Sequence, residues 1–204
     1  MQSFLSINYW LVSFGNSFKF AFYSLSFVLG AGKTTLVNKL LKAKLPLLFS
    51  ISACSRAPRE GEEDKKDYYF LSIEEFKEKI KAEDFIEWEE VYEGNFYGTL
   101  KKEIERIWKE KKHVVFDVDV IGGISLKEYF KENSISIFIK PPSMEVLSER
   151  LKKRNTEDRK SIKNRLEKSF EEMKSIDKFD KIIVNDELNI STKNLIETVE
   201  KFLK

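Results

Sequence analysis

The stretch Gly30-Ala31-Gly32-Lys33-Thr34-Thr35 decides the fold of this chain, which has 204 residues. It stands between an apolar run over residues 20–29 and a segment, residues 36–41, in which apolar side chains recur at helical spacing. A glycine-rich turn between a strand and a helix directs backbone N–H groups and the positive end of the helix at one point. That point suits a phosphate group, with Lys33 placed to reach the β- and γ-phosphates of a nucleotide and Thr34 placed to ligate Mg²⁺. The pattern therefore predicts the phosphate-binding loop of a protein that uses nucleoside triphosphates.

This loop departs from the complete motif, G-x-x-x-x-G-K-[ST], at its first position. The motif has a glycine five residues before Gly32, and this chain has Phe27 there. Glycine serves where the backbone bends sharply or approaches a ligand closely, so a phenylalanine crowds this bend. From the loop alone, a glycine-rich helix start without a ligand stays open as the alternative.

The composition limits the classes of protein to which the chain can belong. Its length suits one α/β domain, or a core domain with a small insertion. The 36 basic and 34 acidic residues leave a net charge of +2, which indicates no extended basic surface for nucleic acid. Cys54 is the only cysteine, and this excludes an internal disulfide and a metal site of several cysteines. We expect a cytoplasmic protein that binds no nucleic acid.

The first 29 residues differ sharply in composition from the rest of the chain. They contain six phenylalanines, six serines and one charged residue, Lys19. The basic start of a secretory signal is missing, and Asn8, Asn16 and Lys19 interrupt any apolar run long enough to span a membrane. We therefore expect no membrane association, and interpret residues 20–29 as a buried first strand that follows an atypical leader. A membrane anchor and a reading-frame error near codon 29 stay open as alternatives.

Two arginines on a predicted loop form a candidate phosphate clamp. A strand predicted over residues 47–52 is followed by residues 55–62, in which proline and glycine indicate a loop. Arg56 and Arg59 lie three residues apart on it, and guanidinium groups bind phosphate through paired N–H donors. A solvated, charged turn is the structural alternative.

The segment from Tyr68 to Thr99 is predicted to be a small β-rich insertion. Residues 72–75 have the pattern of a capping box, which predicts a helix that begins near Ile73. Two strands follow, over residues 85–88 and 91–99. The side chains on this segment that can bind a polar ring or an anion are those of Tyr68, Glu87, Tyr97 and Thr99. A structural role is the alternative for each of them.

An apolar run over residues 113–118 predicts a central strand of a parallel sheet. Ligands of such sheets bind at the carboxyl ends of the strands, where this run presents Asp117 and Asp119. Side chains two apart on a strand share a face, so we expect both carboxylates to point into one crevice. His113 lies at the other end of the run, and we interpret it as structural.

The remaining segments complete the pattern of an α/β protein. Residues 135–139 predict another buried strand, and Ser143 is a suitable cap for a helix that carries Arg150. A second charged helix with Arg165 follows, and such a charge-dense pair with little core is typical of a mobile lid. The chain ends with a predicted strand over residues 181–184 and a helix over residues 191–204. This order of elements predicts a parallel central sheet covered by helices.

Eight stretches of the chain, in order, resemble the guanylate kinase family, and the resemblance runs from about Gly30 to the C-terminus. They are Gly-Ala-Gly-Lys-Thr-Thr at 30–35, Ser-Arg-Ala-Pro-Arg-Glu-Gly-Glu at 55–62, Asp-Tyr-Tyr-Phe at 67–70, Phe-Ile-Glu-Trp at 85–88, Asn-Phe-Tyr-Gly-Thr at 95–99, Asp-Val-Asp-Val at 117–120 with Gly122 and Gly123, Pro-Pro-Ser at 141–143 and Val-Asn-Asp at 184–186. The resemblance implies a three-layer α/β fold of the P-loop NTPase type, with a parallel central sheet, an inserted β-rich GMP-binding region and a helical lid. The expected boundaries are 1–29 for the leader and first strand, 20–54, 100–140 and 180–204 for the P-loop core, 55–99 for the GMP-binding region, and 141–179 for the lid and its flanking helices.

The same resemblance implies transfer of the γ-phosphoryl group of ATP to GMP, giving ADP and GDP. The implied ligands of the GMP phosphate are Ser52, Arg56, Arg59, Tyr68 and Tyr97, and those of the guanine ring are Glu87, Thr99 and Asp119. The implied ATP-binding residues are Gly30, Ala31, Gly32, Lys33, Thr34, Thr35 and Asn185. The implied catalytic residues are Lys33, Arg150 and Arg165. The implied cofactor is Mg²⁺, held by Thr34 and, through water, by Asp117. We expect the two nucleotides as the only partners of a monomer or homodimer.

A function of a different class stays open beside the enzyme. Some guanylate-kinase-like domains are interaction modules that have lost the phosphate-binding loop, and Phe27 favours that alternative. Lys33, Arg150 and Arg165 favour the kinase, because a scaffold has no use for lid arginines. We expect a kinase in which Phe27 affects ATP binding and turnover and leaves the GMP site intact.

Overall fold

The computed structural model describes residues 21–27, 31–153 and 159–204. Gly30 of the phosphate-binding loop and the leader, residues 1–20, lie outside the described residues, as do the side chains of Phe27 and Lys33. Within the described ranges, no helix combines the length and the apolar character needed to cross a lipid bilayer.

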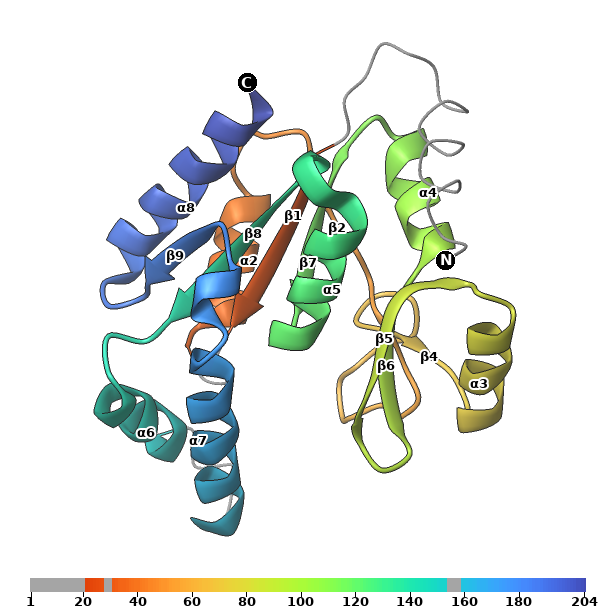
Figure 1. Ribbon diagram of the computed structural model, residues 1–204, viewed down its shortest axis with the longest axis horizontal. Coiled ribbons are helices and arrows are strands. Elements are labelled where there is room, and N and C mark those ends of the chain that lie inside the picture. Colours follow the sequence, from red (N-terminus) through yellow and green to blue (C-terminus); the bar gives the residue numbers. More distant parts are fainter. Residues whose placement is uncertain (1–20, 28–30, 154–158) are drawn as a thin grey trace.

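A five-stranded sheet forms the centre of the molecule (Figure 1). Its strand order is β2-β7-β1-β8-β9, and all neighbouring strands run parallel. The strands are β1 (Phe22–Phe27), β2 (Leu47–Phe49), β7 (His113–Val118), β8 (Ser134–Lys140) and β9 (Lys181–Val184). Because β1 is the middle strand, the chain enters the phosphate-binding loop from the centre of the sheet, the place where parallel sheets bind ligands.

Helices cover both faces of this sheet. They are α2 (Lys33–Leu41) and α8 (Leu188–Leu203) on one face, and α4 (Lys101–Lys109) and α5 (Val120–Phe130) on the other. Tyr23 points into the first core and packs with Leu195 of α8, whereas its neighbour Phe22 points into the second core and packs with Trp108 of α4. Successive residues of a strand face opposite sides, so an unbroken apolar strand needs both cores. The predicted three-layer fold with a parallel central sheet is confirmed.

A second sheet, with the strand order β4-β3-β6-β5, lies to one side of the first (Figure 1). Its elements are β3 (Ala53–Cys54), β4 (Tyr69–Phe70), β5 (Phe85–Tyr92), β6 (Asn95–Leu100) and the covering helix α3 (Ile73–Lys81). Phe76 of α3 stacks on Phe85 and Phe96, with ring centroids 4.4 and 5.5 Å apart. The capping box is present: Ser72 accepts from the Glu75 amide, and the Glu75 carboxylate accepts from the Ser72 amide. The segment predicted to be β-rich, Tyr68 to Thr99, contains β4, β5 and most of β6, and β3 joins the same sheet from before that segment.

Helices α6 (Met144–Lys153) and α7 (Arg159–Met173) lie on the other side of the central sheet (Figure 1). Two short 3₁₀ turns, η1 (Lys131–Asn133) and η2 (Ile176–Lys178), precede β8 and β9. We expected little core here, and the structure differs. Leu147 and Leu151 are buried with Phe138 of β8, because they are four apart and share one face of α6. The base of this region is therefore firmly attached to the sheet.

Some boundaries differ from those expected, for identifiable reasons. Strand β2 ends at Phe49 because the Ile51 amide donates to the Glu103 carboxylate, at 2.9 Å, and not to a strand neighbour. Strand β7 ends at Val118, so Asp119 does not continue the strand but caps α5. Helix α8 begins at Leu188, three residues earlier than expected.

His113 has the structural role expected for it. Its imidazole is buried at the start of β7, and its Nδ1 accepts a hydrogen bond from the Ala21 amide at 2.9 Å. Burial and the nearby Lys112 charge lower the pKa of this histidine. The neutral form that accepts the hydrogen bond is thereby favoured.

Candidate nucleotide-binding site

The phosphate-binding loop is held against the carboxyl end of β9 by Asn185. Gly32, the cap of α2, has a φ of 89°, and a β-carbon there would lie 2.5 Å from Nδ2 of Asn185. Both the left-handed conformation and the lack of space require glycine. The buried Asn185 amide also donates to the Ala31 carbonyl oxygen. Thr34 and Thr35 are exposed on the first turn of α2, where a phosphate could approach them.

Arg150 of α6 contacts the backbone that follows β9, beside the phosphate-binding loop. Its guanidinium donates to the carbonyl oxygen of Asn185 at 2.9 Å and to that of Asp186 at 3.4 Å. One predicted catalytic residue thus contacts the residue that holds the phosphate-binding loop. Arg165, the other predicted lid arginine, is half-buried on α7.

Arg56 is the centre of a polar and aromatic cluster beside the second sheet. Its two terminal nitrogens donate to the Glu62 carboxylate at 2.6 and 2.8 Å, and its Nε donates to the Tyr97 hydroxyl at 3.1 Å. The guanidinium carbon lies 4.9 Å from the centroid of the Tyr68 ring. The paired hydrogen bonds lower the pKa of Glu62 to about 2 and raise the pKa of Arg56. The result is a cation in a fixed orientation.

The Tyr97 hydroxyl can donate a hydrogen bond to an anion. Its hydroxyl oxygen already accepts from Arg56, so its own proton remains for donation to another acceptor. The Tyr68 and Tyr97 rings lie edge to face, with centroids 6.1 Å apart. Three of the predicted phosphate ligands, Arg56, Tyr68 and Tyr97, are therefore brought together.

Ser52 and Arg59, the other two predicted phosphate ligands, lie at the border of this cluster. Ser52 is half-buried, and its carbonyl oxygen accepts from the Tyr69 amide at 2.9 Å. Arg59 is exposed, and its backbone amide donates to Glu62 at 2.8 Å. Among the described residues, neither side chain makes a hydrogen bond to the cluster, so their assignment stays a prediction.

The three residues predicted to bind a guanine ring lie together beside Gly122. Thr99 donates its hydroxyl proton to Glu87 at 2.6 Å. A β-carbon on Gly122 would lie 3.3 Å from Glu87 Oε2 and 3.4 Å from Asp119 Oδ1, which shows that the two carboxylates converge there. Burial and the Asp119 charge raise the pKa of Glu87 to about 7, against the lowering effect of the Thr99 hydrogen bond. The pair is an acceptor surface for a ring that carries N–H donors.

Sequence reasoning missed three residues that lie beside these groups: Glu62, Glu89 and Lys168. Glu62 follows Arg59 by three residues, so its spacing on the loop was a usable signal. Glu89 follows Glu87 by two and therefore shares its face of β5, which was also a usable signal. Lys168 of α7 lies 3.9 Å from Asp119 and 3.9 Å from Glu172. No local pattern indicated that contact, because α7 and Asp119 belong to distant segments.

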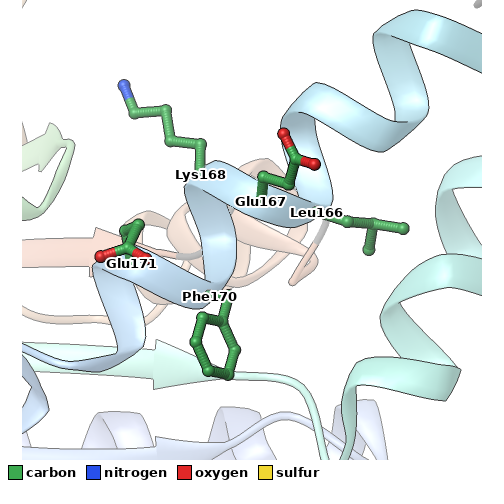
Figure 2. Close-up of a pocket in the computed structure, with 5 residues that line it drawn as sticks. All are labelled: Leu166, Glu167, Lys168, Phe170 and Glu171. Atoms are coloured by element: carbon green, nitrogen blue, oxygen red, sulfur yellow. The ribbon is translucent and has the colours of Figure 1, made fainter.

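A shallow depression on α7 is a poor candidate for the ligand site. The side chains around it are those of Leu166, Glu167, Lys168, Phe170 and Glu171. Figure 2 shows these side chains spread around the helix and pointing in different directions, so they do not converge on one ligand. Lys168 is the member of this set that also contacts the Asp119 carboxylate beside Gly122.

The predicted magnesium ligands lie on two elements, a helix and a strand. Thr34 is on the first turn of α2, and Asp117 is half-buried near the carboxyl end of β7. The described part of the chain contains no group of three or more histidine, cysteine, aspartate or glutamate residues suited to a metal ion.

The middle strand of a parallel sheet leads through a glycine-rich loop into α2, and an inserted sheet beside it carries a candidate anion site and the Glu87 carboxylate. These features define a P-loop nucleotide kinase. The family model described as guanylate kinase matches residues 23–202. This chain therefore belongs to the guanylate kinase family.

Individual relatives agree with the family model. The guanylate kinase of Porphyromonas gingivalis is 47% identical over 175 residues, which cover 85% of this chain and 93% of that protein. The guanylate kinase of Bacteroides fragilis is 44% identical over 174 residues, 85% of each chain. The crystal structure of guanylate kinase from Anaplasma phagocytophilum aligns with a TM-score of 0.72 at 31% identity, covering 89% of this chain and 85% of that one. None of these relatives favours the interaction module.

Proposed function

We propose that this chain transfers the γ-phosphoryl group of ATP to GMP, giving ADP and GDP, through the residues described above. The observation that carries the proposal is a shared face of β6. Tyr97 of the Arg56 cluster and Thr99, the partner of Glu87, are two residues apart and point the same way. An anion site and an acceptor surface for a base edge thus lie next to each other, as a nucleoside monophosphate requires.

The phosphate of GMP is assigned to the Arg56 cluster. Arg56 supplies the charge, Tyr97 and Tyr68 supply hydroxyl donors, and Ser52 and Arg59 complete the set after small movements. Charge-assisted hydrogen bonds to phosphate are the strongest of these contacts. Glu62 does not touch the ligand in this scheme but orients Arg56.

The guanine ring is assigned to Glu87, Thr99 and Asp119. Guanine presents an N1–H and an exocyclic amino group, and both donate to carboxylates. Adenine has an acceptor at N1, which would leave the buried Glu87 carboxylate facing a lone pair. This pairing is the physical basis for selection of GMP over AMP.

ATP is assigned to the loop over residues 30–35 and to Asn185. Lys33, Arg150 and Arg165 are assigned to the charge on the transferred phosphoryl group. We assign residues 55–99 as the GMP-binding region and 141–179 as the lid with its flanking helices, both of which close over the P-loop core. Closure excludes water and brings the lid arginines toward the phosphates.

Mg²⁺ is the cofactor that the family implies, and the donors present suit it. Thr34 offers a hydroxyl and Asp117 a carboxylate, both hard oxygen ligands, and Mg²⁺ prefers a few such ligands with water in the other positions. Bound with ATP, Mg²⁺ offsets charge on the β- and γ-phosphates. We assign Thr34 as a direct ligand and Asp117 as a ligand through water.

The reaction needs no general base from the protein. An oxygen of the GMP phosphate is already anionic; it forms the new bond to the γ-phosphorus as the bond to the β-phosphate oxygen of ATP breaks. The protein supplies alignment of the two phosphates and positive charge around the transferred group. The substrates ATP and GMP, a cytoplasmic location and action as a monomer or homodimer belong to the same proposal.

A coupled assay of ADP formation tests the proposal. The 204-residue chain is given ATP and Mg²⁺ with GMP, AMP, CMP or UMP in turn, alongside the Phe27→Gly variant. We expect turnover with GMP alone. If Phe27→Gly is active and the parent is not, the phosphate-binding loop of the parent is defective. If neither protein forms ADP with any of the four nucleoside monophosphates, the proposal is wrong.

Arg56 variants test the GMP site specifically. We expect Arg56→Ala to raise the KM for GMP by on the order of 100-fold, the loss of a charged hydrogen-bond partner, while the KM for ATP stays within about twofold. Arg56→Lys keeps the charge but loses the planar fork, so we expect an intermediate KM for GMP. Equal increases in both KM values would contradict the assignment.

A further inference from the structure

We propose that Glu103 of α4 is a positioning residue for the phosphate of GMP: its carboxylate fixes the two segments that carry Ser52 and Tyr68. The inference rests on the proposed function, since Ser52 and Tyr68 are assigned there as ligands of that phosphate. It gives a role in substrate binding to a side chain that is completely buried and touches neither nucleotide in that assignment.

Each oxygen of the Glu103 carboxylate holds a different segment of the chain. Oε1 accepts a hydrogen bond at 2.9 Å from the amide of Ile51, which lies between β2 and β3. Oε2 accepts at 2.8 Å from the hydroxyl of Tyr69, which lies on β4. Because one planar group makes both contacts, it fixes the position of the two segments relative to each other.

The two residues held in this way are direct neighbours of two proposed phosphate ligands. Ser52 follows Ile51, and Tyr68 precedes Tyr69. Successive side chains of an extended chain point to opposite sides, so holding one residue from the buried side directs its neighbour the other way. The Tyr68 ring accordingly packs on the Arg56 guanidinium, whereas the Tyr69 hydroxyl reaches the buried carboxylate.

The backbone around Ser52 is also tied to both sheets. The Ser52 carbonyl oxygen accepts from the Tyr69 amide of β4 at 2.9 Å, and the Ser50 amide donates to the Val115 carbonyl oxygen of β7 at 2.9 Å. Glu103 adds the third attachment, between these two, through the Ile51 amide. Ser52 is thus held from three directions, and Glu103 is the side chain that joins them.

Arg106 keeps the Glu103 carboxylate in this orientation. Its Nη2 donates to Oε1 at 2.8 Å and its Nε donates to Oε2 at 3.0 Å, a paired contact that offsets the buried negative charge. Nη2 also donates to the carbonyl oxygen of Phe49, at the end of β2, at 3.4 Å. The carboxylate and the chain that leads to Ser52 are therefore fixed by one pair of residues on α4.

A positioning role and a purely structural role of Glu103 predict different kinetics. If the carboxylate only stabilises the fold, its loss lowers the stability and leaves both KM values of the folded protein unchanged. If it positions phosphate ligands, its loss raises the KM for GMP and leaves that for ATP, because ATP is assigned to residues 30–35 and Asn185. No contact joins Glu103 to those residues in the described part of the chain.

Steady-state kinetics of two variants test the inference. In Glu103→Gln the side chain keeps its size, but its NH₂ group cannot accept, so the donors at one of the two oxygens lose their acceptor. We expect the KM for GMP to rise about tenfold and the KM for ATP to stay within about twofold. Tyr69→Phe removes one of the two attachments and keeps the ring, so we expect an increase of about threefold in the KM for GMP.

Two control variants lie on the same helix. Glu110→Gln makes the same charge change at an exposed partner of Arg106, at 3.4 Å. Ile107→Val shortens a completely buried side chain that packs against the central sheet, and it lowers the stability without removing an attachment of Ser52 or Tyr68. We expect parent KM values in both. A KM for GMP that rises as much in Ile107→Val as in Glu103→Gln, or no rise in Glu103→Gln and Tyr69→Phe, would overturn the positioning role.

Guanosine separates the phosphate ligands from the base ligands, because it presents the guanine ring without a phosphate. We expect Glu103→Gln to raise the Kd of GMP, measured by titration calorimetry without ATP, about tenfold. The Kd of guanosine, measured by ligand-observed NMR, should stay within about twofold of the parent value. Equal increases for GMP and guanosine would show a general disturbance of the second sheet and would contradict the inference.

The failure of this inference and that of the proposed function are distinguishable. Turnover with GMP in the parent, combined with parent KM values in Glu103→Gln, overturns the positioning role alone. A parent that binds GMP without turnover overturns the phosphoryl transfer alone, and the Kd for GMP then replaces KM in the comparison of variants. A parent chain that binds no GMP overturns both.

Discussion

Arg56 has five N–H donors, and in this structure four of them are engaged. Two go to Glu62, one to Tyr97 and one to the Ala57 carbonyl oxygen at 3.0 Å. In the proposed function, the phosphate of GMP would meet an oriented cation with one unused N–H donor, and it would take much of its hydrogen bonding from the tyrosine hydroxyls. The orientation costs little on binding, because it is already present without the ligand.

The Arg56–Glu62 pair makes stability depend on pH in a defined window. The folded-state pKa of Glu62, about 2, is below its ordinary value of 4.5, so the pair contributes stability above pH 4.5. That contribution is lost as the pH falls toward 2. We expect Glu62→Gln to lower the free energy of unfolding by about 1 kcal/mol at pH 7 and by less at pH 3. Urea unfolding followed by circular dichroism measures both values.

The control for this prediction is Glu60→Gln, which changes the charge of an exposed residue on the same loop. It should leave the free energy of unfolding within about 0.5 kcal/mol of the parent. A difference between the parent and Glu62→Gln that grows as the pH falls would contradict the assigned ion pair.

At the scale of elements, α4 links the central sheet to the second sheet through one buried carboxylate. Glu103 accepts from the Ile51 amide at 2.9 Å, from the Tyr69 hydroxyl at 2.8 Å and from Arg106 at 2.8 Å. It is completely buried, and each of its oxygens has at least one donor. The loop that carries Ser52 is therefore held at a fixed place between the two sheets.

Helix α7 reaches the Asp119 carboxylate through Lys168, whose ammonium lies 3.9 Å from it. We expect Lys168→Met to raise the Kd for GMP by about threefold, because the ammonium offsets the negative charge of the two carboxylates that face the guanine ring in the proposed function. Lys163→Met is the matched control, since Lys163 is an exposed lysine on the same helix that pairs with Glu167. Titration calorimetry with GMP measures the Kd of both variants. An unchanged Kd in Lys168→Met would show that Lys168 does not act on this site.

At the scale of the whole molecule, the site is assembled from regions that lie on either side of the central sheet (Figure 1). The Arg56 cluster and Glu87 lie at the second sheet, Asp119 caps α5, which covers the central sheet, and Lys168 is on α7. A ligand that contacts all of them must stabilise the folded arrangement of these regions together.

Thermal unfolding measures that coupling without any enzymatic readout. GMP at 100 times its Kd should add about 2.7 kcal/mol of stability, which for a chain of this size is a Tm increase of about 5–10 °C. We expect no comparable increase with AMP. In Glu87→Gln the increase with GMP should largely disappear, because an amide cannot accept from both guanine donors. Equal increases with GMP and AMP would contradict base selection by Glu87 and Asp119.

By itself, the sequence determined the fold class, the family and most of the chemistry. The glycine-lysine-threonine loop after an apolar strand, the capping box at Ser72 and the paired residues of β5 and β6 are local patterns. Local patterns can be recognised without coordinates, because each depends on the spacing of neighbouring residues along one element. Proximity of Arg56 to Tyr97 and of Glu87 to Asp119 could be inferred from the family resemblance alone.

Only the tertiary structure decided which charges meet across segments far apart in the chain. The contact of Lys168 with Asp119, the hold of Asn185 on the phosphate-binding loop and the burial of Glu103 between two sheets depend on how helices pack on sheets. Packing brings these groups together where little water reaches them, and a polar group that lacks a partner there is costly. The spacing of residues along the chain carries no such information.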